Sequence, residues 1–361
     1  MKGLCFMDEG SRQAAQGEKF PYRPRVAGWE LTLACNMNCI HCGSSAGHPR
    51  PDELRVDEGL DLIGQMVDLG LEMITLSGGE PLMHPAWDVY ARRLSEGGVK
   101  TQMITNALLL EKSAQKMKDS GIKTFGISLD GMEETHNFIR NNPKSFQMAL
   151  RGVKAAHEAG LTVGVVTHVS GANRDELEAM YQLFQEIGIK FWQIQVVFKM
   201  GRMKEHQDYA VEPEDLPGIA HFIYEKRKLG GLPNVFPGDN LGYYGCEPIF
   251  DKEWKGCFAG RHLMGIDADG TIKGCLSLPR EFAEGNVRTE PLRQIWEDPN
   301  RFRYNRYFNP DMLEGHCKGC PKGDPCRAGC TITAYAATGN KFDNPYCLYR
   351  VERETGRGQN C

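Results

Sequence analysis

Six short apolar segments alternate with stretches of helical period between residue 29 and about residue 230, and this alternation constrains the fold more than any other feature. The segments start roughly 24–43 residues apart, which is the spacing of strand–helix–strand units. Strands connected in this way form a parallel sheet with right-handed crossovers, so the sequence predicts an α/β fold. The strands are expected at Glu30–Leu33, Met73–Ser77, Lys100–Thr105, Thr124–Leu129, Thr162–His168 and Phe191–Val197.

Apolar residues at helical spacing mark the expected core faces of the intervening helices. These residues are Leu60, Ile63, Val67, Phe146, Ala149, Leu150, Val153, Leu177, Met180, Phe184 and Ile187. Periodicity alone does not distinguish an open doubly wound sheet from a partial barrel. In both arrangements the functional site is expected at the carboxyl ends of the strands.

Three cysteines follow the first expected strand, at Cys35, Cys39 and Cys42. Three thiolates can hold three irons of a four-iron cluster, and the fourth iron is then open to a small molecule. A zinc site with His41 as its fourth ligand is the alternative, but structural zinc sites usually contain Cys-x2-Cys pairs. The run therefore favours an iron–sulfur site.

The 13 cysteines are unevenly distributed over the 361 residues: three lie at 35–42, none at 43–245 and nine at 246–361. The N-terminal segment Met1–Arg25 lacks the apolar core of a signal peptide, so we expect a cytoplasmic protein. Reducing conditions there favour metal sites over disulfides, and the clustering predicts two metal-bearing regions around a metal-free scaffold. Cys5 and Cys361 lie near the termini and are expected to take no part.

Charge and hydropathy argue against two classes of partner. The net charge is −4 and basic residues are not in excess, so no nucleic-acid partner is expected. No apolar run approaches the ~18 residues of a membrane span, so no membrane partner is expected either.

The run Cys-x3-Cys-x2-Cys at the end of the first strand resembles the signature of the radical S-adenosylmethionine (SAM) superfamily. The resemblance implies a partial (β/α)6 barrel and a [4Fe–4S] cluster, held by Cys35, Cys39 and Cys42, whose open iron chelates SAM. It also implies reductive cleavage of SAM to a 5′-deoxyadenosyl radical that abstracts hydrogen from a substrate. The position before the third cysteine, commonly aromatic and close to adenine, is His41 here.

The resemblance extends to motifs at the ends of later strands. Gly78-Gly79-Glu80-Pro81 resembles the motif that holds the SAM amino group, and Asn106 ends the third strand. Ser128-Leu129-Asp130-Gly131, followed by Arg140, resembles a pattern whose serine contacts the SAM ribose or carboxylate. The arginine of that pattern pairs with the carboxylate, which suits its planar guanidinium.

Two further positions near strand ends are candidates without a decisive pattern. Asn173 is expected either to contact ribose or to cap the following helix. Gln193 and Gln195 alternate with apolar residues on the sixth strand, and polar groups inside a barrel need a partner. Gln195 is therefore a candidate for a cofactor or substrate contact.

Seven cysteines near the C-terminus resemble the SPASM extension of radical SAM enzymes, which usually carries two auxiliary [4Fe–4S] clusters. Three clusters are then expected in all, and a two-site zinc appendix is the alternative. The pattern is Cys257, Gly270-x4-Cys275, Cys317-x2-Cys320-x5-Cys326-x3-Cys330 and Cys347. The resemblance assigns Cys317, Cys320, Cys326 and Cys347 to an outer cluster, and Cys257, Cys275 and Cys330 to an inner one.

The fourth ligand of the inner cluster lies outside this pattern. We predict Cys246; otherwise an open iron there binds substrate directly. The expected regions are an N-terminal segment (1–28), the barrel (29–235), and a bridging region with the SPASM domain (236–361). Tyr243 and Tyr244 of the bridging region are candidates for lining the substrate channel, and a simple linker is the alternative.

The resemblance implies peptide or protein modification, with auxiliary clusters accepting an electron. Sulfatase maturases carry an aspartate directly after the cysteine of Gly-x4-Cys, whereas this chain has Leu276. We therefore expect maturation of a ribosomal peptide by crosslinking, epimerisation or excision. Formylglycine formation and a small-molecule enzyme of the haem-biosynthesis type are the alternatives, and an iron–sulfur electron carrier is the non-enzymatic one. Expected partners are an electron donor such as flavodoxin or ferredoxin and a separate leader-peptide-binding protein.

Replacing Cys35, Cys39 and Cys42 together by alanine should abolish 5′-deoxyadenosine formation, because no other three thiols are expected to hold a SAM-binding cluster. The measurement is chromatography of an anaerobic reaction with SAM and dithionite. The Cys5→Ala variant is the control and should retain activity. Residual 5′-deoxyadenosine in the triple variant would contradict the assignment.

Overall fold

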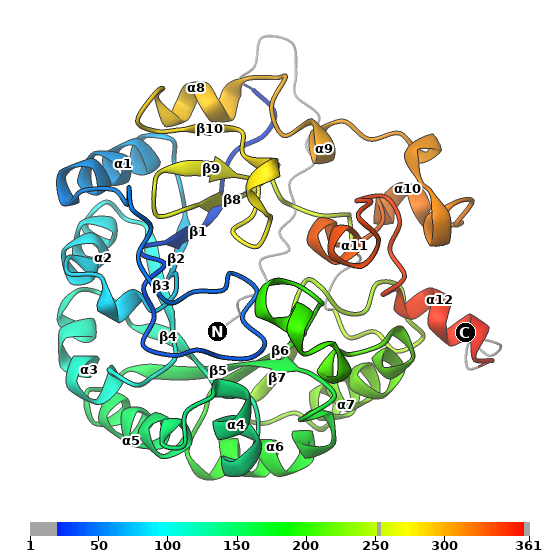
Figure 1. Ribbon diagram of the computed structural model, residues 1–361, viewed down its shortest axis with the longest axis horizontal. Helices are drawn as coiled ribbons and strands as arrows, with labels where there is room; N and C mark the ends of the chain where they lie inside the picture. Colours follow the sequence, from blue (N-terminus) through cyan, green and yellow to red (C-terminus); the bar gives the residue numbers. More distant parts are fainter. Residues whose placement is uncertain (1–19, 251–253, 357–361) are drawn as a thin grey trace.

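A ten-stranded sheet organises the part of the chain that the computed structural model describes, residues 20–250 and 254–356. The strand order is β10-β9-β8-β1-β2-β3-β4-β5-β6-β7, and β1 to β7 are parallel to their neighbours. Figure 1 shows the sheet curving around the centre of the molecule, which confirms the α/β partial barrel. The parallel strands are β1 (Val26–Glu30), β2 (Met73–Ser77), β3 (Lys100–Thr105), β4 (Thr124–Ser128), β5 (Thr162–Val169), β6 (Phe191–Val196) and β7 (Asn234–Pro237).

The helices that connect these strands cover the outer side of the sheet (Figure 1). They are α1 (Val56–Asp68), α2 (Trp87–Glu96), α3 (Leu110–Asp119), α4 (Glu133–Arg140), α5 (Ser145–Glu158), α6 (Leu177–Glu186) and α7 (Leu216–Leu229). The expected core faces are confirmed, since Ile63, Ala149, Met180 and Phe184 have no exposed surface. No helix in the described ranges is long and apolar enough to cross a membrane.

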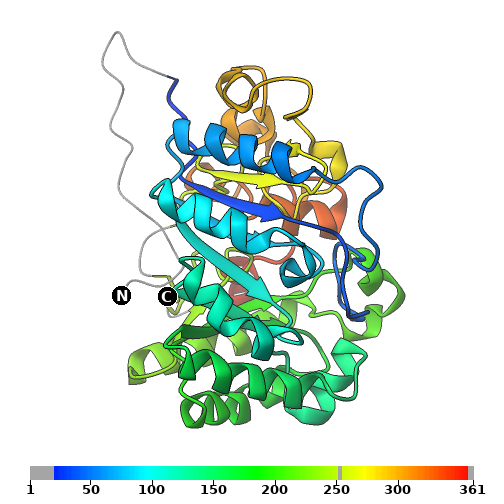
Figure 2. The ribbon, with the colours of Figure 1, turned by 90° about the vertical axis from the view of Figure 1, so that its left-hand side faces the viewer.

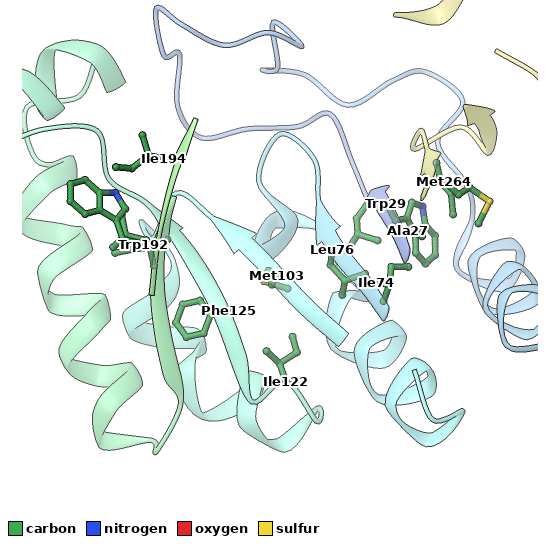
Figure 3. Close-up of a cluster of buried hydrophobic side chains, with 14 of the residues drawn as sticks. Ala27, Trp29, Ile74, Leu76, Met103, Ile122, Phe125, Trp192, Ile194 and Met264 are labelled. Atoms are coloured by element: carbon green, nitrogen blue, oxygen red, sulfur yellow. The ribbon is translucent and has the colours of Figure 1, made fainter. Parts of the chain in front are cut away.

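The main core lies between the sheet and these helices. Figure 3 shows buried side chains from successive strands, including Trp29, Met103, Phe125 and Trp192. The ring of Trp29 stacks on Tyr90 of α2 with centroids 5.1 Å apart. Such contacts fix the helices on the strands and leave the carboxyl ends of the strands free for polar side chains.

The first strand differs from its prediction, because β1 is Val26–Glu30 rather than Glu30–Leu33. After Leu31, the Leu33 amide and the Thr32 hydroxyl donate to the Glu53 carboxylate, at 2.8 and 3.0 Å, so the chain leaves the sheet. The other five predicted strands agree with the structure to within one residue at each end. Strand β7 was not predicted, and the expected domain boundary at residue 235 falls within it.

The C-terminal region joins the barrel through main-chain pairing. Strand β8 lies parallel to β1, with Leu263 opposite Val26, and Figure 2 shows the yellow β8 beside the blue β1. A tight turn precedes Gly270, which has a φ of +85° and whose amide donates to the Asp267 carbonyl. The elements of this region are β8 (Leu263–Ile266), β9 (Thr271–Lys273), β10 (Gly285–Asn286), α8 (Leu292–Glu297), α9 (Arg303–Arg306), α10 (Gly323–Cys326), α11 (Thr331–Thr338) and α12 (Leu348–Glu354).

The Phe184→Ala substitution should lower the free energy of unfolding by about 3–5 kcal/mol, because it leaves a cavity where the Phe184 ring meets Trp192 edge-on. Phe138→Ala is the matched control: its ring is 47% exposed, and the loss should stay below about 1 kcal/mol. Anaerobic urea unfolding of the two variants and the parent protein measures both values. Equal losses would show that α6 is not packed as described.

Candidate active site

The cysteine loop after β1 is closed by its own backbone. The Gly47 amide donates to the Leu33 carbonyl, and the Cys35 amide donates to the Gly47 carbonyl, both at 3.1 Å. Arg202 binds the loop from a later segment, donating to the Cys39 carbonyl at 2.8 Å and to the Ala46 carbonyl at 2.9 Å. The loop is therefore held in one shape by contacts distant in sequence.

The three cysteine sulfurs of this loop lie near one another. Burial raises the pKa of Cys35 to about 11, and repulsion from Cys39 and Cys42 acts in the same direction. Asn106 Nδ2 donates to Cys35 Sγ and Arg140 Nη1 to Cys39 Sγ, each at 3.8 Å. Three free thiols in one loop, two of them with N–H donors, fit an iron–sulfur cluster held by three thiolates.

The Gly78-Gly79 pair brings the end of β2 against this loop. The Gly79 amide donates to the Thr32 carbonyl and the Glu80 amide to the Ala34 carbonyl, both at 2.8 Å. A Cβ at Gly78 would overlap the Thr32 carbonyl oxygen, and one at Gly79 would overlap that of Ala34. The glycines thus permit a close approach between two backbones.

Glu80 connects the ends of β2 and β3. Its fully buried carboxylate accepts from the Thr105 hydroxyl at 2.7 Å, the Asn106 amide at 2.8 Å and the Leu82 amide at 3.1 Å. Burial raises the pKa of Glu80 to about 7, even though these donors oppose the shift. Pro81 opens the short helix that follows. A contact between Glu80 and the SAM amino group stays a prediction.

A buried ion pair lies at the end of β4. Asp130 pairs closely with Arg140 of α4, and its carboxylate accepts from the His168 amide at 2.9 Å. Burial alone would raise the pKa of Asp130, but Arg140 and the surrounding histidines hold it well below its usual range. Burial lowers the pKa of His41 and His136 to about 3, so both imidazoles are neutral at physiological pH.

The structure gives Arg140 two partners near the cysteine loop. Its guanidinium pairs with Asp130 and donates to Cys39 Sγ, so it is already placed before any carboxylate binds. Ser128, the last residue of β4, is 9% exposed. The SAM contacts of these residues stay predictions.

Asn173 stands at the N-cap position of the short helix that follows, but its side chain makes no capping hydrogen bond there, and a ribose contact stays a prediction. Its side-chain amide donates to the Asp130 carbonyl at 2.8 Å and the His168 carbonyl at 3.0 Å, and its oxygen accepts from the Ser170 amide at 2.7 Å. Asn173 therefore ties the end of β4 to the end of β5.

His168 joins this site although the sequence analysis did not single it out. Its ring centroid lies 5.4 Å from that of His41, and Gln195 on β6 forms a side-chain hydrogen bond with it. His41, Asp130 and His168 bring ligand atoms within 4.8 Å of one another, but the Arg140 guanidinium already neutralises the carboxylate. The sequence signal that could have identified His168 is its position at the carboxyl end of a predicted strand. Arg202, which binds the cysteine loop, carries no such signal in the sequence.

The C-terminal cysteines fall into two groups. Cys317, Cys320, Cys326 and Cys347 influence one another electrostatically, and so do Cys257, Cys275 and Cys330. Cys257 and Cys330 share a hydrogen bond, which lowers the pKa of Cys257 and raises that of Cys330. These are the sets expected for the outer and inner clusters, and their ligation of iron stays a prediction.

Cys246 differs from the other cysteines of the described chain. It is exposed and disulfide-bonded, contrary to the expectation of no disulfides, whereas ten others are free thiols. Because a disulfide sulfur is not a thiolate ligand, its predicted role requires reduction of this bond. Cys5 and Cys361 lie outside the described residues.

Both tyrosines of the bridging region have backbone partners. The Tyr243 hydroxyl donates to the Asp239 carbonyl at 2.6 Å and accepts from the Cys330 amide at 2.9 Å. The Tyr244 hydroxyl donates to the Trp254 carbonyl. These contacts support a structural role, and contact with a substrate stays a prediction for both.

Known proteins share this arrangement of motifs. The profile of the Radical SAM superfamily matches residues 29–184, and that of the SPASM iron–sulfur cluster-binding domain matches residues 257–321. The AdoMet-dependent heme synthase of Methanosarcina barkeri is 32% identical over 91% of this chain and 97% of its own length. The chain belongs to the radical SAM superfamily. This radical SAM enzyme also carries the SPASM domain, as its cysteine order predicted.

Other relatives of this radical SAM enzyme have different names. Fe-coproporphyrin III synthase of Methanosarcina barkeri is 28% identical over 92% of this chain and 89% of its own length. Mycofactocin maturase MftC of Mycolicibacterium smegmatis is 26% identical over 92% and 84%. The structure of Streptococcus suis SuiB bound to S-adenosylmethionine shares the fold, with a TM-score of 0.70, 17% identity, and coverage of 90% of this chain and 76% of SuiB.

Gly79→Ala should prevent assembly of the SAM-binding cluster, because the added methyl group would overlap the Ala34 carbonyl just before Cys35. Gly47→Ala is the matched control in the cysteine loop itself, where a Cβ meets no atom within 4 Å. Electron paramagnetic resonance of the reduced proteins, with and without SAM, makes the measurement. The SAM-dependent change should disappear in Gly79→Ala and persist in Gly47→Ala; a normal response in Gly79→Ala would refute this role.

Proposed function

We propose that this enzyme oxidises a side chain of an iron porphyrin by SAM radical chemistry, as a haem-biosynthesis enzyme. The observation that carries the proposal is 32% identity to an AdoMet-dependent heme synthase over nearly the full length of both chains. A second relative is named for Fe-coproporphyrin III. The preference for a ribosomal peptide substrate, drawn from the sequence, is supported less well than this alternative.

The residues at the cysteine loop fit the proposed cofactors. Cys35, Cys39 and Cys42 would hold the SAM-binding cluster, which together with SAM supplies a one-electron cleavage to a 5′-deoxyadenosyl radical. Glu80 presents a carboxylate to an ammonium group, and Arg140 presents a guanidinium to a carboxylate. The imidazoles of His41 and His168 lie near Arg140, and both are neutral at physiological pH.

Electron balance assigns a role to the C-terminal region. A propionate carboxylate that loses one hydrogen atom, one electron and carbon dioxide becomes a vinyl group. The hydrogen atom leaves to the deoxyadenosyl group, and the electron needs an acceptor. The inner thiols Cys257, Cys275 and Cys330 would hold a cluster that accepts this electron. An external donor of the flavodoxin or ferredoxin type would supply the electron that cleaves SAM.

Leu276 is consistent with this balance. The reaction above removes no proton from the reacting carbon, so it needs no general base there. Leu276 follows Cys275, and its Cβ lies 3.4 Å from the position of a Cβ on Gly28 of β1. An apolar side chain packed on β1 offers no base, which disfavours formylglycine formation by the route expected for sulfatase maturases.

Peptide maturation is the second candidate. The 26% identity to mycofactocin maturase MftC over 92% of this chain favours it. A leader-peptide-binding partner belongs to this candidate alone.

Isotope transfer should separate the two candidates. The reconstituted enzyme receives SAM, reductant and either Fe-coproporphyrin III deuterated on its propionates or a deuterated peptide fraction, and the 5′-deoxyadenosine is weighed. We expect deuterium from the porphyrin, with a product lighter by carbon dioxide and two hydrogen atoms per side chain. The Cys35/Cys39/Cys42→Ala variant should transfer none. Deuterium from the peptide fraction alone would replace the proposal by peptide maturation.

A further inference from the structure

The inner cysteine set provides three thiols, whereas a four-iron cluster has four irons to coordinate. Cys257, Cys275 and Cys330 lie together, and the other free cysteines of the described chain belong to the outer set or to the loop after β1. Cys246 is exposed and disulfide-bonded. A fourth protein ligand would therefore have to come from another type of side chain.

Asp239 is held beside the inner cysteines by two consecutive hydrogen bonds. Its carbonyl accepts from the Tyr243 hydroxyl at 2.6 Å, and the same hydroxyl accepts from the Cys330 amide at 2.9 Å. Asp239 is the second residue after β7, and the Gly238 amide between them donates to the Ile194 carbonyl of β6 at 2.7 Å. The residue thus lies where the carboxyl ends of the barrel strands meet the SPASM domain.

The Asp239 carboxyl group lies within electrostatic range of Cys257 in the inner set. The Cys257 charge acts on Asp239 and, together with burial, raises its pKa to about 6. The side chain lies deep among protein atoms and yet has accessible surface, so it borders a space inside the molecule rather than the outer surface.

The buried carboxylates of Asp130, Asp267 and Glu80 each have partners, which are cations for the two aspartates and three hydrogen-bond donors for Glu80. Asp130 pairs with Arg140, and Asp267 pairs with Lys273 at 2.7 Å. The Asp239 carboxyl group has no hydrogen bond or ion pair to any residue between 20 and 250 or between 254 and 356. An unpaired carboxylate that borders this space is available to bind a cation, and an iron ion would neutralise it.

We propose that Asp239 is the fourth protein ligand of the inner cluster, together with Cys257, Cys275 and Cys330. One oxygen ligand donates less electron density to iron than a thiolate does, so it raises the reduction potential of the cluster, as nitrogen ligands do in Rieske centres. A higher potential suits a cluster that accepts an electron from a substrate. The assignment holds for either substrate class, because it concerns only the ligands of the cluster.

The test uses the full chain with Cys35, Cys39 and Cys42 replaced by alanine, so that only the auxiliary clusters contribute. Mössbauer spectra should resolve one iron with a non-sulfur ligand. In the Asp239→Cys variant this iron should show the signature of an iron with sulfur ligands only, and the midpoint potential of the inner cluster should fall. Asp239→Ala should expose an iron that binds added cyanide, detected by electron paramagnetic resonance. If Asp239→Ala instead loses the inner cluster, Asp239→Cys should restore it.

Two control variants make the test selective. Glu247→Ala removes a carboxylate from the same bridging segment, one that pairs with His221 of α7, and should leave spectra and potentials unchanged. Cys246→Ser should also leave the inner cluster intact. Unchanged spectra in both Asp239 variants, or failure of Asp239→Cys to restore a cluster lost in Asp239→Ala, would overturn the proposal. Loss of the inner cluster in Cys246→Ser would assign the ligand to Cys246 instead.

Discussion

The candidate site depends on two main-chain hydrogen bonds between the end of β2 and the segment before the cysteine loop. The Gly79 and Glu80 amides donate to the Thr32 and Ala34 carbonyls, and only glycine at positions 78 and 79 leaves room for them. The Glu80 carboxylate accepts hydrogen bonds from Thr105 and Asn106 at the end of β3, and the Asn106 side chain donates to Cys35 Sγ. The carboxyl ends of β2 and β3 therefore position the cysteine loop.

The buried pair of Asp130 and Arg140 organises the other side of this site. Buried ion pairs add little net stability, because desolvation of both charges offsets their attraction. This pair instead fixes the positions of its neighbours. The Asp130 carboxylate accepts a hydrogen bond from the His168 amide, and the Asp130 carbonyl accepts one from the Asn173 side chain. Arg140 donates a hydrogen bond to Cys39 Sγ. A network with partners on three elements holds the guanidinium close to a predicted cluster ligand.

Much of the fold followed from local patterns, and the misses have tertiary causes. The bounds of β2 and β3 were predicted to the residue, because apolar runs coincide with buried strands there. The first strand was misplaced, since Glu53 draws Thr32 and Leu33 out of the sheet. The resemblance to the SPASM pattern gave both C-terminal cysteine groups, whereas His168 was marked only by its place at a strand end and no local pattern marks Asp239. Their positions depend on strand ends and loops that meet only in the folded chain.

The pairing of β8 with β1 places the two halves of the proposed chemistry on one sheet. Strand β1 leads into the cysteine loop, while the hairpin of β8 and β9 leads into Cys275. Lys273 pairs with the buried Asp267 and donates to the Leu276 and Leu278 carbonyls, so the segment after Cys275 is fixed to that hairpin. A radical source and an electron acceptor held at strands of one sheet would keep a constant separation. Substrate differences within such a family can then arise from the side chains between them, without any change in the scaffold that supports both.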